Sequence, residues 1–589
     1  MTKRTKRIHC LLAVAIGVIP MSGCQQLKAV FAKRPSQDMP PYKQVDVKFE
    51  NQNWSANQRG WFYHTGQGTE LLPYKWFLAL EQPKIKIFGT VPRFSDTDYL
   101  ARFGFLPDDA NAQNPNGLPV GFAKDTVNDP KSGESVEVVG LTCAACHTGQ
   151  LEYHGNGVRI DGGSATVDLA SFQTELGYAV AFTDKVPFRF DRFARAVLGE
   201  NASDEAKKEL KQRFEAFLNA GLSESNAADA GKLYAAAGGF GRTDALGRIG
   251  NYVFGTELDN ANLRVADAPV KLPPLWDTSW FNWVQYNASI QQPMVRNIGE
   301  ALGVRARVNL TDSKNLYGST VNVKSLWEME NLLAGPTPFT GLKPPAWPAE
   351  TFGPIDQAKA QKGAELYKQH CQSCHLPPLN SPEIQDSAYW EAGSEGRRFL
   401  KLKVIPLEKI GTDPREASDW HERTAVTGIL GLGTVPATVG LRAVTAKIRD
   451  INYDKLQLSA EQRLEWSGFR DDGVTAQMGY RARPLGGLWS TPPFLHNGSV
   501  PSLYQLLLPA DQRDKTFYVG NREFDPKDVG YSKGPFQGGF EFRTDQPGDP
   551  HPGNSNLGHE FRNTPGKGVL GPELSDEERW AIIEYLKTL

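Results

Sequence analysis

Two short cysteine motifs constrain this chain more than any other feature of its sequence. They span residues 143–147 (CAACH) and 371–375 (CQSCH). In the pattern C-x-x-C-H, two thiols can add to the vinyl groups of one porphyrin, and the next histidine can bind the iron. The chain has six cysteines, and these motifs use every cysteine beyond residue 24. The sequence therefore predicts two covalent haem c groups, bound by Cys143, Cys146 and His147 and by Cys371, Cys374 and His375.

Two other interpretations of the motifs explain less. A redox-active dithiol needs two cysteines with this spacing, but it does not need the histidine that follows. A zinc site built from the four cysteines would leave both histidines unexplained. Haem attachment accounts for all six residues.

Length and composition describe a large, ordinary globular chain. Its 589 residues suggest several domains, and 22% of them are charged, with a formal net charge of -2. No basic excess points to nucleic acid as a partner. The 57 glycines and 40 prolines favour long irregular connections around the haems.

The N-terminus is typical of an exported lipoprotein. A basic head at residues 3–7 precedes an apolar run at 11–20, which is too short to span a bilayer. Residues 21–24 (MSGC) resemble a bacterial lipobox, which implies cleavage before Cys24 and a lipid on its sulfur. Ordinary signal cleavage without a lipid is the alternative. By the same resemblance, Gln25 favours the outer membrane, so we expect a periplasmic or cell-surface lipoprotein.

We predict a mainly α fold with two cytochrome c-like domains, long irregular loops and insertions. A proline cluster at 336–354 suggests the boundary between them. The expected divisions are a signal peptide at 1–23, a tether at 24–44, a first haem domain with an N-terminal extension at 45–345 and a second haem domain at 350–589.

Local patterns predict several elements. Residues 136–142 are β-branched and extended in character, and residues 203–218 form a helix capped by Ser203. Residues 356–370 have helical spacing and lead into the second box. Ser575 and Glu578 form a capping box at the start of a C-terminal helix. This last helix is expected to cross the helix at 356–370, as in cytochrome c.

The two boxes, together with residues 491–499 (TPPFLHNGS), resemble the bacterial di-haem cytochrome c peroxidase superfamily. Residues 517–531 and the terminal Gly558-His559-Glu560 are most similar to its rubber oxygenase-like branch. The resemblance covers most of the chain after about residue 130. It implies that the first haem activates peroxide or dioxygen, and that the second transfers electrons from a donor such as a small cytochrome or cupredoxin.

The sixth ligand of the second haem departs from the peroxidase pattern. Peroxidases of this superfamily supply a methionine, but the chain has none after Met478. The resemblance favours His559 as this ligand. It implies that His496 supports the iron ligands without binding the iron itself. His496, His551 and a tyrosine such as Tyr518 or Tyr531 stay open as alternatives.

The resemblance also suggests residues around the first haem. Trp276 matches a tryptophan between the haems and is the candidate electron relay, although a core role remains open. Glu300 and Gln292 match the acid–base glutamate and the glutamine of the peroxidases. The alternative for Glu300 is a solvated helix position. Rubber oxygenase-like members instead keep an apolar pocket on the distal side of the first haem. Glu300 is therefore the residue that distinguishes a peroxidase from an oxygenase.

Two further predictions concern calcium and the alternative function. Some peroxidases bind calcium between the haems through residues that match Thr491 and Pro493. The resemblance therefore allows a calcium ion at these two residues. The alternative to an enzyme is a pure electron-transfer cytochrome in which both irons are six-coordinate, with His64 or His154 on the first haem.

Overall fold

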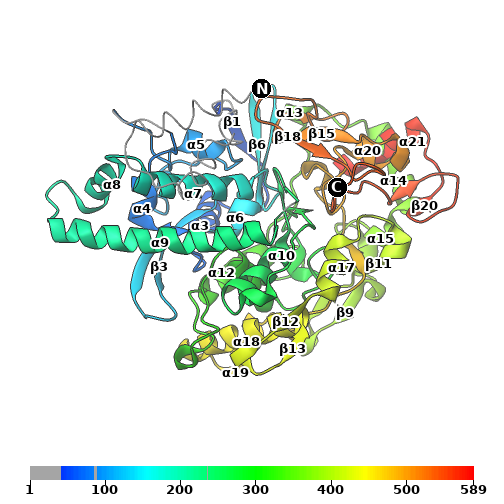
Figure 1. Ribbon diagram of the computed structural model, residues 1–589. Coiled ribbons are helices and arrows are strands. Elements are labelled where there is room, and N and C mark those ends of the chain that lie inside the picture. The colour runs from blue at the N-terminus through cyan, green and yellow to red at the C-terminus, as the bar shows by residue number, and fades with distance from the viewer. Residues whose placement is uncertain (1–41, 85–88, 235) are drawn as a thin grey trace.

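A computed structural model describes residues 42–84, 89–234 and 236–589 (Figure 1). The predicted signal peptide, the predicted lipidation site Cys24 and most of the predicted tether lie outside these residues. Among the described residues, no helix is both long enough and apolar enough to cross a bilayer. The predicted division into two haem domains stays a prediction.

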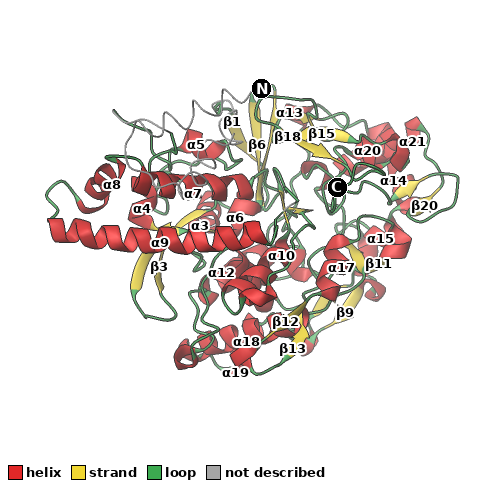
Figure 2. Cartoon of the chain, viewed as in Figure 1, coloured by secondary structure: helices red, strands yellow, loops and turns green. Residues whose placement is uncertain are grey.

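The prediction of a mainly α fold was wrong, because the molecule mixes helices and sheets (Figure 2). Helices make up 40% of the chain and strands 16%. The strands are short and pair mostly in twos, in connections that the sequence led us to expect as irregular loops. Such ladders satisfy the backbone N–H and C=O groups of long connections that pack against the protein interior.

The first haem box lies between two small sheets. One has the strand order β2-β4-β3 and the other β1-β6-β5. The box forms the one-turn helix α6 (Cys143–Cys146), which joins β4 to β5. The extended segment predicted at 136–142 is confirmed as β4. The strands are β1 (Asp46–Phe49), β2 (Leu72–Pro73), β3 (Phe122–Asn128), β4 (Ser135–Leu141), β5 (Thr148–Tyr153) and β6 (Asn156–Asp161).

Helices cover these sheets. The longest is α9 (Asp204–Ala230), which lies along one side of the N-terminal half in Figure 1. Ser203 caps it, as predicted, but the helix continues beyond residue 218. The other helices here are α3 (Ala56–His64), α4 (Tyr74–Ala79), α5 (Thr97–Ala101), α7 (Leu169–Lys185) and α8 (Arg189–Leu198).

A helical layer joins the two halves. Helix α11 (Pro293–Gly303) packs against α10 (Ala245–Gly250), α12 (Val323–Ala334) and α18 (Ala437–Lys455). Its inner face is fully buried at Met294, Ile298 and Leu302. Further elements of the chain are β7 (Arg242–Thr243), β8 (Val270–Lys271), α16 (Leu407–Ile410), α17 (Arg415–Glu422), β12 (Thr424–Val426), β13 (Thr434–Pro436) and α19 (Ala460–Trp466).

The second box follows helix α14 (Gln357–His370), which the C-terminal helix α21 (Asp576–Lys587) crosses. Asp356 caps α14, and the Ser575–Glu578 capping box of α21 is confirmed. The helices approach closely at Gly363, where a Cβ atom would lie 2.0 Å from the carbonyl oxygen of Ala581. Glycine therefore permits the crossing expected for a cytochrome c-like domain.

Short elements complete the second half. Its helices are α13 (Ala349–Phe352), α15 (Gln372–His375) and α20 (Leu503–Leu506). Its strands are β9 (Trp390–Ala392), β10 (Arg398–Leu400), β11 (Lys403–Pro406), β14 (Gly479–Ala482), β15 (Thr516–Val519), β16 (Phe524–Asp525), β17 (Gly530–Tyr531), β18 (Phe540–Arg543), β19 (Glu560–Phe561) and β20 (Val569–Gly571).

Candidate haem sites

Both box histidines are oriented by a backbone carbonyl. His147 Nδ1 lies 2.7 Å from the carbonyl oxygen of Pro273, and His375 Nδ1 lies 2.7 Å from that of Arg483. A histidine whose Nδ1–H is bound in this way presents Nε2 to a metal, as metal-ligating histidines usually do. Burial lowers the pKa of His147 to about 4 and also lowers that of His375. A lowered pKa favours the neutral imidazole, which is the form that binds iron.

The thiols of the boxes do not behave as a redox dithiol. Burial raises the pKa of Cys143, Cys146 and Cys371 to about 12, whereas reactive dithiols have a lowered thiol pKa. The residues described contain no group of three or more His, Cys, Asp or Glu side chains that could hold a metal ion. The structure thus favours haem attachment over both alternatives.

His559 faces the histidine of the second box. The ring centroids of His375 and His559 are 6.1 Å apart, with 61° between the ring planes. Imidazole nitrogens bind metal ions at about 2 Å, and each ring centre lies roughly 1 Å behind its nitrogen, so two rings on opposite sides of one ion lie about 6 Å apart. His559 Nδ1 has no hydrogen-bond partner in the described chain. The pair fits an iron with two histidine ligands.

His496, His64 and His154 lie elsewhere. His496 is buried and stacks on Tyr480, with ring centroids 4.0 Å apart. Both ring nitrogens of His64 have partners, the carbonyl oxygen of Phe122 at 2.8 Å and Asp108 Oδ2 at 2.7 Å. His154 lies exposed at the turn between β5 and β6. No ring contact like that of His375 with His559 is found for His147 in the described ranges.

The surroundings of the two candidate haem sites are a structural repeat that sequence reasoning missed. Residues 270–290 and 480–500 follow the same path at a constant separation of 210 positions. Each copy has a 3-10 turn, Thr278–Trp280 or Leu488–Ser490, and then a bridge, Val284 with Ile290 or Phe494 with Val500. The carbonyls that orient the box histidines, at 273 and 483, are also equivalent. The shared residues Pro-Leu (274–275, 484–485) and Asn-x-Ser (287–289, 497–499) are the signal that could have shown it.

The two copies interlock. The backbone N–H of Lys271 donates to the His496 carbonyl at 2.8 Å, and that of the equivalent Arg481 donates to the Tyr286 carbonyl at 2.9 Å. Each copy therefore holds the turn of the other, which fixes the two box histidines relative to one another.

The repeat differs where the second copy holds the segment that carries His559. Asn497 Nδ2 donates to the Ser555 carbonyl at 2.9 Å, and Ser499 Oγ donates to the same carbonyl at 2.8 Å. In the first copy, both polar side-chain atoms of Asn287 and the hydroxyl of Ser289 are buried and have no hydrogen-bond partner in the described chain. The first copy thus holds no equivalent of the His559 segment.

Glu300 lies beside the first box, on α11. Its negative charge adds to the effect of burial on the pKa of Cys143 and Cys146, and burial raises the pKa of Glu300 itself. Gln285 Nε2 donates to Glu300 Oε1 at 2.9 Å. Gln292 caps α11 instead: its Oε1 accepts from the Val295 N–H at 2.7 Å.

Trp276 belongs to a core that both boxes share. It is fully buried, and Cys143 and Cys371 pack against the same hydrophobic cluster. Its indole N–H donates to the Gly486 carbonyl at 2.8 Å. This placement allows a relay role and a packing role alike.

The residues predicted to hold calcium do not fit a calcium ion. The ammonium group of Lys271 donates to the carbonyl oxygens of Thr491 and Pro493, the latter at 2.8 Å. Lys271 is only 6% exposed, and it has no acidic partner within 4 Å in the described chain. The Lys271 amine, whose pKa is lowered to about 7 by burial, therefore occupies the two oxygens that calcium would need.

Comparisons with known proteins identify a family segment and two relatives. A family model described as RoxA-like, cytochrome c-like matches residues 479–518, which include Arg483 and His496. The uncharacterised protein y4iJ of Sinorhizobium fredii is 48% identical over 578 residues, 94% of this chain and 95% of that protein. The uncharacterised protein y4iM of the same organism is 27% identical over 335 residues, 54% of this chain and 64% of that protein. The matched segment indicates a haem-dependent redox function and a relationship to rubber oxygenase-like cytochromes c. The chain therefore belongs to the same family as y4iJ and carries a RoxA-like, cytochrome c-like segment in its second half.

Proposed function

We propose that this protein is a di-haem c-type oxidoreductase that activates peroxide or dioxygen at its first haem. The second haem receives electrons from a donor such as a small cytochrome or cupredoxin. A haem with an open face can bind and reduce such oxidants, whereas a six-coordinate haem passes electrons. The proposal rests on one contrast: a histidine faces His375, and none faces His147 in the described chain.

The chain's own residues support this division of roles. The carbonyls of residues 273 and 483 orient both box histidines alike, but only the second copy of the repeat holds a ligand-bearing segment. At the first site, Glu300 is the group that could hold or move a proton, since burial raises the pKa of its carboxyl and Gln285 positions it.

The alternative is a pure electron carrier with two saturated irons. It requires His64 or His154 to reach the first iron. The two ring nitrogens of His64 are already bound, and His154 is exposed, so the geometry favours an enzyme.

Two assays separate the possible oxidants. The purified holoprotein is incubated with peroxide and a reduced small cytochrome, and separately with polyisoprene under air. Oxidation of the cytochrome supports a peroxidase, and cleavage of the polymer supports an oxygenase. Reaction in neither assay, with both haems present and low-spin, would favour the electron carrier.

The proposal includes a location. A lipid on Cys24 would tether the protein to the outer membrane. This location lies outside the cytoplasm, and haem c is also attached to proteins outside the cytoplasm. Replacing Cys24 with Ala should release the protein from the membrane fraction while haem content stays the same. Unchanged membrane association would argue against the anchor.

A further inference from the structure

We propose that Arg483 is a positioning residue that links the two haem ligands and provides the main electron path between them. This inference rests on the proposed function, because it requires two bound haems. Arg483 is not among the site residues that were predicted from the sequence.

A nearly continuous chain of bonds joins the two box histidines through Arg483. His375 Nδ1 lies 2.7 Å from the Arg483 carbonyl oxygen, and the Arg483 guanidinium returns to the first half of the repeat. There, Nη1 donates to the Pro274 carbonyl at 3.0 Å. Pro274 is bonded to Pro273, whose carbonyl oxygen lies 2.7 Å from His147 Nδ1. Three hydrogen bonds and the intervening covalent bonds therefore connect one imidazole to the other.

The repeat explains why only one of the two equivalent positions can form this link. Residues 273 and 483 play the same role for their box histidines, but residue 273 is a proline without a side-chain donor. The guanidinium of Arg483 supplies donors in a rigid fork, and Nη2 also lies 3.4 Å from the Trp276 carbonyl oxygen. The Arg483 side chain of the second copy thus contacts the first copy next to the carbonyls that orient the two box histidines.

Trp276 offers the competing route. Its ring packs in the cluster that both boxes share, and the Arg483 guanidinium carbon lies 5.8 Å from its centroid. Contacts of this kind cross van der Waals gaps, and electrons tunnel less readily across a gap than along covalent and hydrogen bonds. We assign the electron to the bonded chain through Arg483 rather than to the ring of Trp276. This chain carries one electron from the donor of the proposed function towards the first haem, and no bond is made or broken along it.

The side chain can be removed without touching either histidine, since His375 is held by the backbone carbonyl of residue 483. Arg483→Met removes the guanidinium donors and keeps this carbonyl. Arg483→Lys restores one donor. Arg481→Met is the matched control, because Arg481 lies only two positions before Arg483 and is also partly buried, but its side chain donates to the Gln285 carbonyl and its backbone N–H to that of Tyr286. Trp276→Phe tests the competing route.

The experiment follows reduction of the full-length holoprotein by a one-electron donor in a stopped-flow spectrometer. A pyridine haemochrome assay first establishes two haems per chain in every variant, and loss of haem there would count against the proposed function rather than against Arg483. The intramolecular phase is the one whose rate does not depend on donor concentration.

Arg483→Met should slow this phase by about tenfold or more, which corresponds to about 1.4 kcal/mol of activation free energy. Its haem spectra should stay as in the parent protein, Arg483→Lys should recover part of the rate, and Arg481→Met should leave it unchanged. A parental rate in Arg483→Met would overturn the proposal. So would equal slowing by Arg481→Met, or slowing by Trp276→Phe alone.

Discussion

His375 and His559 are 184 positions apart in the sequence, yet their rings face one another with centroids 6.1 Å apart. This spacing suits two imidazoles on opposite sides of one iron. His559 is held there from both directions along the chain: its N–H donates to the Ile410 carbonyl at 3.0 Å, and its carbonyl accepts from Arg513 Nη2 at 2.9 Å.

Replacing His559 should change the second haem alone. His559→Ala should convert it from low-spin to high-spin, and His559→Met should raise its reduction potential, because methionine ligation favours ferrous iron. Absorption spectra and redox titration measure both effects. His154→Asn, at an exposed turn, is the control and should alter neither. An unchanged low-spin spectrum in His559→Ala would show that another group binds this iron.

Glu300 decides between the two activities. If the protein reduces peroxide, Glu300→Gln should lower the turnover by about 100-fold or more, the usual contribution of a positioned acid–base group. Steady-state oxidation of a reduced cytochrome by peroxide measures this. Glu215→Gln, on the wet face of α9, is the control for the loss of a carboxylate. Unchanged peroxide turnover in Glu300→Gln would remove this residue from the mechanism.

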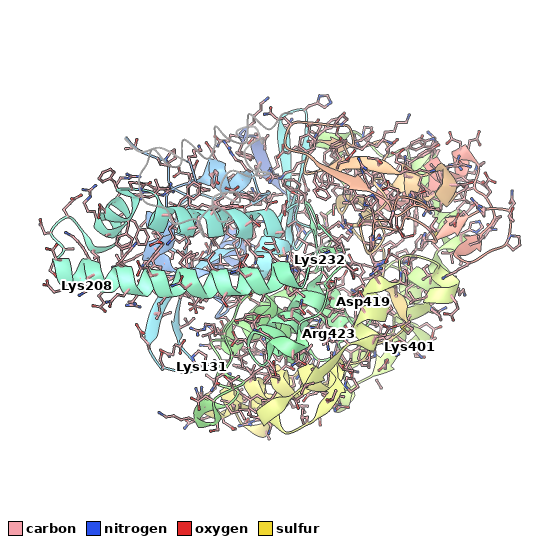
Figure 3. The ribbon with its side chains drawn as sticks, viewed as in Figure 1. Lys131, Lys208, Lys232, Lys401, Asp419 and Arg423 are labelled. Carbon is pink, nitrogen blue, oxygen red and sulfur yellow. The ribbon has the colours of Figure 1, made fainter. Side chains whose placement is uncertain are left out.

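The protein should not need calcium. Since Lys271 already occupies the carbonyl oxygens of Thr491 and Pro493, calorimetry should detect no stoichiometric calcium binding, and a chelator should leave the haem spectra unchanged. Lys271→Met leaves buried carbonyls without a donor and should cost about 1–3 kcal/mol of stability. Lys401→Met, at an exposed position labelled in Figure 3, should cost much less. Tight calcium binding by the parent protein would contradict this assignment.

Glu416 should make stability depend on pH. It lies on α17, the helix of Asp419 in Figure 3, and is only 4% exposed. Burial, with Asp244 nearby, raises its pKa to about 8. Between the ordinary pKa of 4.5 and about 8, the folded protein binds this proton more tightly than the unfolded chain. Its contribution to stability is therefore present at low pH and is lost as the pH rises through this range.

Thermal unfolding of Glu416→Gln between pH 5 and 9 measures this contribution. The variant should gain stability relative to the parent protein as the pH rises, by at most about 1.4 kcal/mol per pH unit. Glu422→Gln, exposed on the same helix, should follow the parent curve. Parallel curves for the parent and Glu416→Gln would show that this carboxyl does not set the pH dependence.

Local signals in the sequence predicted local structure well. Caps at Ser203 and Ser575 marked helices that the structure contains, because a cap depends on a few neighbouring residues. The mixed fold class was missed in part because some of its ladders join distant segments. For example, β11 pairs with β14 across more than 70 positions, and neither strand has a strong pattern of its own.

The candidate sites show the same limit. The boxes at 143–147 and 371–375 could be recognised from five residues each. The carbonyls that orient their histidines come from residues 273 and 483, which have no side-chain signature for this role. The sequence also does not indicate that Lys271 takes the place of a metal ion, because only the fold brings its side chain to the carbonyls of Thr491 and Pro493.

The central claim is that one of two covalently bound irons keeps an open coordination position. Titration of the fully reduced protein with carbon monoxide, with haem content measured on the same sample, tests it most directly. We predict two haems and one bound carbon monoxide per chain. No binding would mean that both irons are saturated, and two bound molecules would mean that His559 does not close the second.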